Sequence, residues 1–199
     1  DDVKFNTSLV LADDELGKYI GDAHSVIVGL EQINDRVLSH CPNVRMIVKY
    51  GVGLDNIDLD ACKRRDIEIG WTGGVNRLSV AEITLGMMLG LTRNIYRTSN
   101  ELKNGVWDKN GGVQLSGMTV GIIGVGNIGK EVIRLLKPFN CRILVNDIID
   151  QSVYYAVEQV EEASKEQILK EANIISLHVP LTPETNRLID EKSIALMRN

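Results

Sequence analysis

Three glycines, Gly124, Gly126 and Gly129, follow the apolar segment 120–123 with the spacing G-x-G-x-x-G. Each suits one task in binding a dinucleotide: Gly124 makes a tight turn, Gly126 lets the backbone approach a pyrophosphate, and Gly129 lets a helix lie close to the strand. The pyrophosphate would sit at the helix N-terminus, where unpaired N–H groups and the helix dipole favour an anion. The alternative is a plain strand-to-helix turn that binds nothing.

The next expected strand, Arg142 to Asp147, ends on the carboxylate of Asp147. Asp147 lies about as far after the glycine motif as the acidic residue that accepts a hydrogen bond from the ribose 2′-hydroxyl in dinucleotide-binding domains. A carboxylate would repel a 2′-phosphate, so the pattern favours NAD over NADP.

Alternating strands and helices would position these residues, which predicts an α/β fold with parallel sheets. In the first part we expect helices over 14–20, 35–40 and 58–65 and strands over 25–28, 46–49 and 67–69. In the second part we expect strands over 120–123, 142–147 and 173–178, with helices from about Ile128 to Pro138, near 164–172 and near Asp190. Ser164 and Gln167 are spaced as a capping box.

One long helix is expected from Asn76 to Lys103, opened by Ser79 and Glu82 in capping-box spacing and stopped by Asn104 and Gly105. The apolar residues of this helix are assigned to the core: Leu85, Met87, Met88, Leu89 and Leu91. Its apolar stretch is far shorter than the roughly 20 residues that cross a bilayer. We therefore expect no membrane association.

Composition narrows the function classes. The 199 residues carry a net charge of -5, and Lys63–Arg65 is a short basic run that we interpret as a solvated face, so nucleic acid is not an expected partner. The three cysteines, Cys41, Cys62 and Cys141, have no metal-like spacing and cannot all pair, which predicts no metal site and a reducing cytoplasm. The first residues show no signal peptide.

The predicted domains are 1–75 and 76–199. Only about three strands are identifiable after residue 118, whereas a dinucleotide-binding sheet usually has about six. We therefore expect both domains to be partial, with a partner that completes the sheet as the alternative.

Four ordered motifs together resemble the D-isomer-specific 2-hydroxyacid dehydrogenase family, which includes phosphoglycerate dehydrogenase. They are Lys49–Asp58, Gly74–Glu82, the glycine motif with Asp147, and His178–Thr185. The resemblance implies a flavodoxin-like substrate domain beside a Rossmann NAD-binding domain, with the active site between them. It also implies a homodimer that uses the long helix.

By this resemblance, backbone N–H groups of Gly51, Val52 and Gly53 bind the substrate carboxylate, and Val52 also lies near the nicotinamide. The alternative is a simple turn in which Asp55, Asn56 and Asp58 cap the next helix. The cofactor residues implied are Val52, Gly124, Gly126, Asn127, Ile128, Gly129, Asp147, Val179, Pro180 and Thr185.

The family's catalytic Arg, Glu and His cannot be assigned within this chain and are expected beyond Asn199. The motif places His178 on the cofactor side, as a satisfied strand-end histidine, and His24 and His40 are expected on the surface. One departure concerns the substrate: phosphoglycerate-specific relatives often have an Arg where this chain has Gly29, and Lys49 could supply one charge.

The resemblance implies an NAD-dependent oxidoreductase that moves a hydride between nicotinamide and a small D-2-hydroxy acid or 2-keto acid, of the 3-phosphoglycerate, glycerate, glyoxylate or lactate type. Two alternatives remain. One is a non-catalytic NAD-sensing module similar to the family's transcriptional corepressors. The other is an inactive truncated paralogue that forms mixed dimers.

Overall fold

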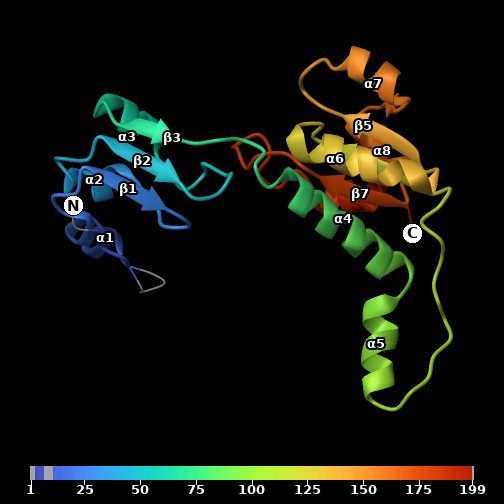
Figure 1. Cartoon of the computed structure of the whole chain (residues 1–199). Helices are drawn as coiled ribbons and strands as arrows, with labels where there is room; N and C mark the ends of the chain where they lie inside the picture. Colours follow the sequence, from blue (N-terminus) through green and yellow to red (C-terminus); the bar gives the residue numbers. More distant parts are fainter. Residues whose placement is uncertain (1–2, 7–10, 199) are drawn as a thin grey trace. The chain divides into compact units, whose positions relative to one another are not determined.

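The computed structural model describes residues 3–6 and 11–198 and forms two compact units, Asp1–Gly73 and Gly74–Asn199 (Figure 1). The sequence predicts a division at residue 75. The role of the first unit as a substrate domain stays a prediction.

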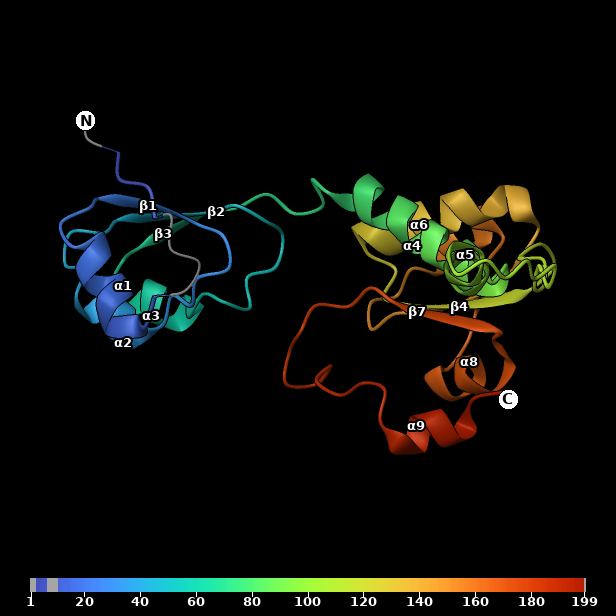
Figure 2. The same cartoon turned by 90° about the horizontal axis from the view of Figure 1, so that it is seen from below.

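The first unit is a parallel sheet in the order β1-β2-β3, with its helices on one face (Figure 2). Its elements are α1 (Asp13–Ile20), β1 (Ser25–Val28), α2 (Asp35–Ser39), β2 (Met46–Lys49), α3 (Leu59–Arg64) and β3 (Glu68–Gly70). Strand residues alternate between the two faces. Val28 and Ile47 therefore join Val37 and Ala61 in the core, while Ile27 is 76% exposed.

The second unit is a parallel sheet in the order β6-β5-β4-β7. Its strands are β4 (Thr119–Ile123), β5 (Arg142–Asn146), β6 (Glu161–Glu162) and β7 (Ile174–Leu177). Its helices are α4 (Arg77–Thr92), α5 (Ile95–Lys103), α6 (Asn127–Leu136), the 3₁₀ turn η1 (Lys137–Phe139), α7 (Ser152–Glu158), α8 (Lys165–Glu171) and α9 (Glu191–Leu196). Helices α4 and α6 cover one face of the sheet and α8 covers the other, with α9 packed against α8 (Figure 2).

This strand order is that of the first four strands of a dinucleotide-binding sheet, in which β4 is the first strand of the unit and the order reverses between β4 and β7. The predicted α/β fold with parallel sheets is confirmed. No helix in the described part of the chain is long and apolar enough to cross a membrane.

The single long helix expected over 76–103 is wrong. It is broken into α4 and α5 at Asn94, which adopts the left-handed conformation with φ of 53°. The start at Asn76 is confirmed, since Asn76 is the N-cap of α4, but the capping box is wrong, because Ser79 and Glu82 both lie inside the helix. The stop is confirmed: Asn104 caps α5 and Gly105 has φ of 79°.

The expectation that α4 is buried throughout is also wrong. Met88 is buried and Leu85 and Leu89 pack against the core, but Met87 and Leu91 are exposed. A helix that is apolar on all sides does not indicate in its sequence which face the fold covers.

Two elements were not expected from the sequence, the helix α7 and the two-residue strand β6. At α8 the Ser164 half of the predicted capping box is confirmed, because Ser164 accepts from the N–H of Gln167, and no bond from the Gln167 side chain back to Ser164 is described. Asp190 caps α9 in the same way. Pro138 lies in the 3₁₀ turn that follows α6.

Candidate functional site

The glycine turn after β4 is built by close approaches of the backbone. Gly124 has φ of 94°, and a Cβ at this position would lie 2.5 Å from the carbonyl oxygen of His178. A Cβ on Gly129 would lie 2.2 Å from the carbonyl oxygen of Gly124. Both positions therefore require glycine, one for the turn itself and one for the packing of α6 on it.

Gly126 differs from the other two glycines because nothing lies within 4 Å of a Cβ built on it. It precedes α6, and no side chain caps this helix. The helix N-terminus thus faces open space with its backbone donors uncapped by side chains, an arrangement that fits an anionic group such as a pyrophosphate.

Asp147 lies directly after β5 and faces this turn. Its Oδ2 accepts from the N–H of Val125 at 2.6 Å, and its Oδ1 accepts from the N–H of Ile149 at 3.0 Å. A carboxylate offers about four lone-pair positions, so acceptor capacity remains for a ribose hydroxyl. Gln151 holds the same turn from the other side, because its Nε2 donates to the carbonyl of Val125 at 3.0 Å. Sequence reasoning did not single out Gln151.

The other predicted cofactor residues lie around the same turn. Asn127 begins α6 beside Gly74, whose added Cβ would lie 2.7 Å from Asn127 Cγ. The side chain of Ile128 packs against the core instead of facing solvent. Val179 follows β7 next to the turn, since its Cγ1 would lie 2.9 Å from a Cβ on Gly124.

Thr185 is already engaged within its own loop. Its hydroxyl donates to the carbonyl of Pro180 at 2.6 Å and accepts from the N–H of Thr182 at 2.8 Å. It therefore shapes the segment that carries Val179 and Pro180, and direct contact with a cofactor stays a prediction.

His178 is half-buried at the end of β7, with its Nε2 2.9 Å from the hydroxyl of Ser176. Burial lowers the pKa of His178 below the usual value of a histidine. His24 and His40 are exposed.

The loop after β2 has the conformation that only glycine adopts readily. Gly51 has φ of 137°, and a Cβ there would lie 3.2 Å from Lys49 Cε. A Cβ on Gly53 would lie 2.7 Å from Oδ1 of Asp55, the end of a side chain that can move. Because the Lys49 side chain lies beside Gly51, the loop is placed in a positive environment.

Lys49 also connects this loop to the segment after β1. Its ammonium donates to Asn56 Oδ1 at 2.6 Å and to the carbonyl of Gly29. The buried Asn56 donates in turn to the carbonyl of Glu31 at 2.6 Å. Asn56 is therefore a bridge between two loops and not a helix cap, whereas Asp58 does cap α3 by accepting from the N–H of Ala61.

A carboxylate stands in the segment after β1. Glu31 Oε2 accepts from the N–H of Gly29 at 2.8 Å. Two of the three N–H donors of the Lys49 ammonium already bond to groups of the protein. The capacity of Lys49 to bind a phosphate group is therefore reduced.

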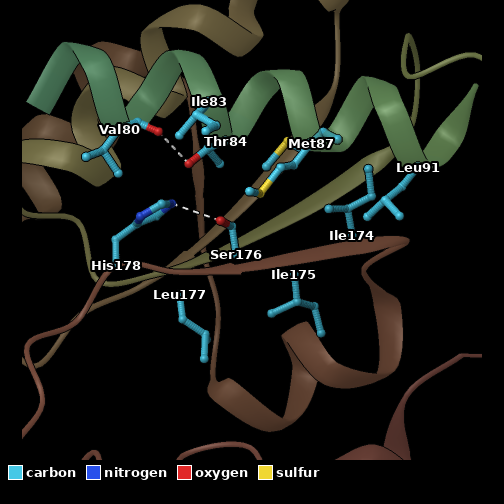
Figure 3. A pocket seen from close by; sticks show the side chains of 11 residues that line it. Val80, Ile83, Thr84, Met87, Leu91, Ile174, Ile175, Ser176, Leu177 and His178 are labelled. Carbon is cyan, nitrogen blue, oxygen red and sulfur yellow. Dashed lines mark hydrogen bonds between the residues drawn. The ribbon is translucent and has the colours of Figure 1, made fainter. Parts of the chain in front are cut away.

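A cavity of ≈ 440 Å³ lies between α4 and β7 (Figure 3). It is lined by Val80, Ile83, Thr84, Met87, Met88, Leu91 and residues 174–178. Its polar side chains already have partners, since Thr84 donates to the carbonyl of Val80 and Ser176 pairs with His178. None of the predicted substrate or cofactor residues lines it, so the candidate site is the glycine turn and not this cavity.

Cys41 and Cys62 are buried free thiols, and Cys141 is a half-buried one. Burial raises the pKa of all three. Among the described residues no group of His, Cys, Asp and Glu has the arrangement of a metal site. The Lys63–Arg65 run is exposed, and Arg64 and Arg65 pair with Asp35.

Residues 85–199 match the family described as D-isomer specific 2-hydroxyacid dehydrogenase, NAD binding domain. The chain belongs to this family. The second unit is accordingly its NAD-binding domain, and the turn between β4 and α6 is where that domain carries its glycine motif.

Relatives of this 2-hydroxyacid dehydrogenase chain agree with the assignment. It is 37% identical over 196 residues to the hydroxypyruvate reductase of Thermotoga maritima, covering 97% of this chain and 63% of the relative. It is also 37% identical over 195 residues to the D-3-phosphoglycerate dehydrogenase of Methanocaldococcus jannaschii, covering 94% of this chain and 37% of the relative.

A solved structure of D-lactate dehydrogenase from Aquifex aeolicus, complexed with NAD and lactic acid, has a TM-score of 0.83 and 31% identity, covering 94% of this chain and 56% of that one. The chain spans less than two thirds of the length of each of these three relatives.

Proposed function

We propose that the protein containing this chain is an NAD-dependent oxidoreductase that interconverts a small D-2-hydroxy acid and its 2-keto acid. The observation that carries the proposal is the turn at Gly124–Gly129 with Asp147 bonded to it, in a domain of the NAD-binding family. When bound, NAD supplies the hydride acceptor. The chain's own residues bind and orient it: the N-terminus of α6 holds the pyrophosphate and Asp147 holds the adenine ribose.

The loop Gly51–Gly53 is proposed to hold the carboxylate of the substrate. Its backbone N–H groups are donors that require no side chain, and Lys49 beside Gly51 adds positive charge. We propose that Val52 also lies near the nicotinamide, and that Asn127, Ile128, Val179, Pro180 and Thr185 line the cofactor site.

We propose a substrate without a phosphate group, of the hydroxypyruvate, glyoxylate or pyruvate type. The support is the carboxylate of Glu31 after β1 and the internal use of Lys49. A charge-assisted contact contributes about 1.5–3 kcal/mol, so a missing cation lowers the preference for a phosphorylated substrate by roughly tenfold or more.

The test is the consumption of NADH by the natural full-length protein with hydroxypyruvate, glyoxylate, pyruvate and phosphohydroxypyruvate. We expect turnover with at least one of the first three and a lower kcat/KM for phosphohydroxypyruvate. Glu31→Arg should raise kcat/KM for phosphohydroxypyruvate relative to hydroxypyruvate, and Glu15→Arg in the first unit serves as the charge-matched control. A higher kcat/KM for phosphohydroxypyruvate in the unchanged protein would reverse the substrate assignment.

NADH binding without turnover of any 2-keto acid would instead favour a non-catalytic NAD-sensing module. That reading uses the same glycine turn and Asp147, so the binding measurement alone does not separate the two functions. Failure to bind NADH at all would favour an inactive paralogue that acts in mixed dimers.

We further propose a homodimer formed through α5. No residue of this helix is buried, although Ile95, Tyr96 and Leu102 are large and apolar. A second copy would cover an apolar surface that is otherwise exposed to water. A reducing cytoplasm is the proposed compartment, because all three thiols are free.

A further inference from the structure

Trp71 follows β3 and reaches across to the loop after β2. Its indole Nε1–H donates to the carbonyl oxygen of Val52 at 2.8 Å. The other end of the ring lies over the backbone of Gly73, where an added Cβ would be 3.0 Å from Trp71 Cη2. The indole is therefore held between the loop and its own strand end, while 47% of the residue stays exposed.

This hydrogen bond orients the whole peptide group between Val52 and Gly53, and not only the carbonyl of Val52. In a trans peptide the C=O of one residue and the N–H of the next point in opposite directions. Holding the Val52 oxygen toward Trp71 therefore directs the N–H of Gly53 away from the indole. One indole thus sets the direction of a backbone donor in the loop.

The hydrogen bond matters for the order of this loop because the glycines Gly51 and Gly53 flank Val52. Gly51 already has φ of 137°, and glycine restricts backbone rotation less than any other residue. Ordering this peptide only when a ligand arrives would cost conformational entropy at that step. A donor that orders it beforehand removes that cost.

We infer that Trp71 is a positioning residue that pre-orders the Val52–Gly53 peptide for an anionic ligand. The inference rests on the proposed function of this loop, because the ligand is the carboxylate of the 2-keto acid. Trp71 itself does not need to touch the substrate, and its partial exposure makes its fluorescence sensitive to changes in the loop.

Steady-state kinetics of Trp71→Phe in the natural full-length protein provide the test. Phe keeps an aromatic ring over Gly73 but lacks the donor. We expect KM for the 2-keto acid to rise about three- to tenfold, which corresponds to the loss of one hydrogen bond, with kcat within about twofold and the Kd of NADH unchanged. The matched control is Trp107→Phe, which changes the other, 73% exposed tryptophan of this chain and should leave all three constants unchanged.

A purely structural role for Trp71 would give a different result. The unfolding midpoint would fall and kcat would fall with the fraction of folded protein, while KM would stay constant. Unchanged KM in a well-folded Trp71→Phe variant would overturn the inference.

Fluorescence titration with oxalate, a planar dicarboxylate, gives a second readout that does not depend on turnover. In the presence of NADH we expect oxalate to change the tryptophan emission of the natural protein and of Trp107→Phe, and not that of Trp71→Phe. If oxalate inhibits competitively without changing the emission, the positioning role is rejected and the proposed function survives. If the natural protein neither reduces a 2-keto acid nor responds to oxalate, the proposed function itself fails.

Discussion

The carboxylate of Asp147 holds the glycine turn by accepting from the N–H of Val125. Asp147→Asn keeps the shape of the side chain but removes its charge. We expect NADH to bind about tenfold or more weakly, since a hydrogen bond to a charged group contributes about 1.5–3 kcal/mol. The preference for NADH over NADPH should also shrink, because the repulsion of a 2′-phosphate is lost.

Isothermal titration with both cofactors measures this change. Asp150→Asn, three residues further along the same loop, is the control, because Asp150 bonds only to Ser152 among the contacts described. If the ratio of the NADPH Kd to the NADH Kd were the same in the unchanged protein and in Asp147→Asn, this carboxylate would not select the cofactor.

Gly51 and Gly53 should respond differently to alanine. Gly51→Ala forces a side chain into φ of 137° and toward Lys49, which costs on the order of 1–3 kcal/mol. Gly53→Ala meets only the mobile end of Asp55. We expect Gly51→Ala to lower the urea midpoint and raise KM for the 2-keto acid more than Gly53→Ala does, and the reverse order would contradict the loop geometry.

The burial of His178 leads us to expect that the free energy of unfolding depends on pH. Its pKa in the folded protein is lowered by burial, whereas in the unfolded chain it has its usual value near 6.5. Below that value the unfolded chain binds a proton that the folded protein excludes, so stability is full above pH 6.5 and falls as the pH decreases toward the folded pKa.

Urea unfolding at pH 7.5 and 5.5 checks this prediction. We expect His178→Gln to lose less stability than the unchanged protein between these values, while His24→Gln, at an exposed position, loses as much. Equal losses in His178→Gln and the unchanged protein would show that burial of His178 does not contribute.

At the scale of elements, two glycines of α4 give a matched pair. A Cβ on Gly90 would lie 2.4 Å from the ring of Tyr96, which packs back from α5, whereas nothing lies within 4 Å of one on Gly86. Gly86→Ala should raise the free energy of unfolding by about 0.5–1 kcal/mol. Gly90→Ala should lower it by about 1–3 kcal/mol, because the tyrosine is displaced.

Circular dichroism during urea titration distinguishes the two variants. If both alanines stabilise the protein, Tyr96 does not pack against Gly90 and the junction of α4 and α5 is different in solution.

The same junction shows where sequence reasoning stops. No proline or glycine marks Arg93–Asn94, so the helical pattern reads as continuous, and the left-handed residue is an asparagine whose tolerance of positive φ is only a weak signal. Strand β6 was missed for a similar reason: two glutamates show no apolar alternation, and the strand forms because β5 offers it backbone partners.

The glycine motif was predictable because the spacing of its glycines is local in sequence, whereas the close approach of Gly124 to the carbonyl of His178 was not. Contacts that shape the loop Gly51–Gly53 were not, since Trp71 and Val52, or Lys49 and Gly29, meet only through the register of the sheet. An indole donor directly after a strand was the one available signal for Trp71. A donor on a large apolar side chain usually finds a partner when it is partly buried.

At the scale of the whole molecule, the proposed homodimer can be tested by breaking the apolar surface of α5. Leu102→Glu would place a charge between two copies, so sedimentation velocity should show a monomer. Val153→Glu, at a 79% exposed position on α7, should leave the dimer intact. A monomeric unchanged protein would exclude the dimer, and a dimeric Leu102→Glu would exclude α5 as its interface.

The two-residue strand β6 also limits how the sheet can associate with other chains. It forms one edge of the sheet in the second unit and consists of Glu161 and Glu162, which are both exposed. A long apolar edge is a template for aggregation, whereas a short acidic edge offers few backbone groups and repels an identical copy. Replacing both glutamates by valine would therefore create an amyloid-like hazard at an edge that now terminates strand pairing.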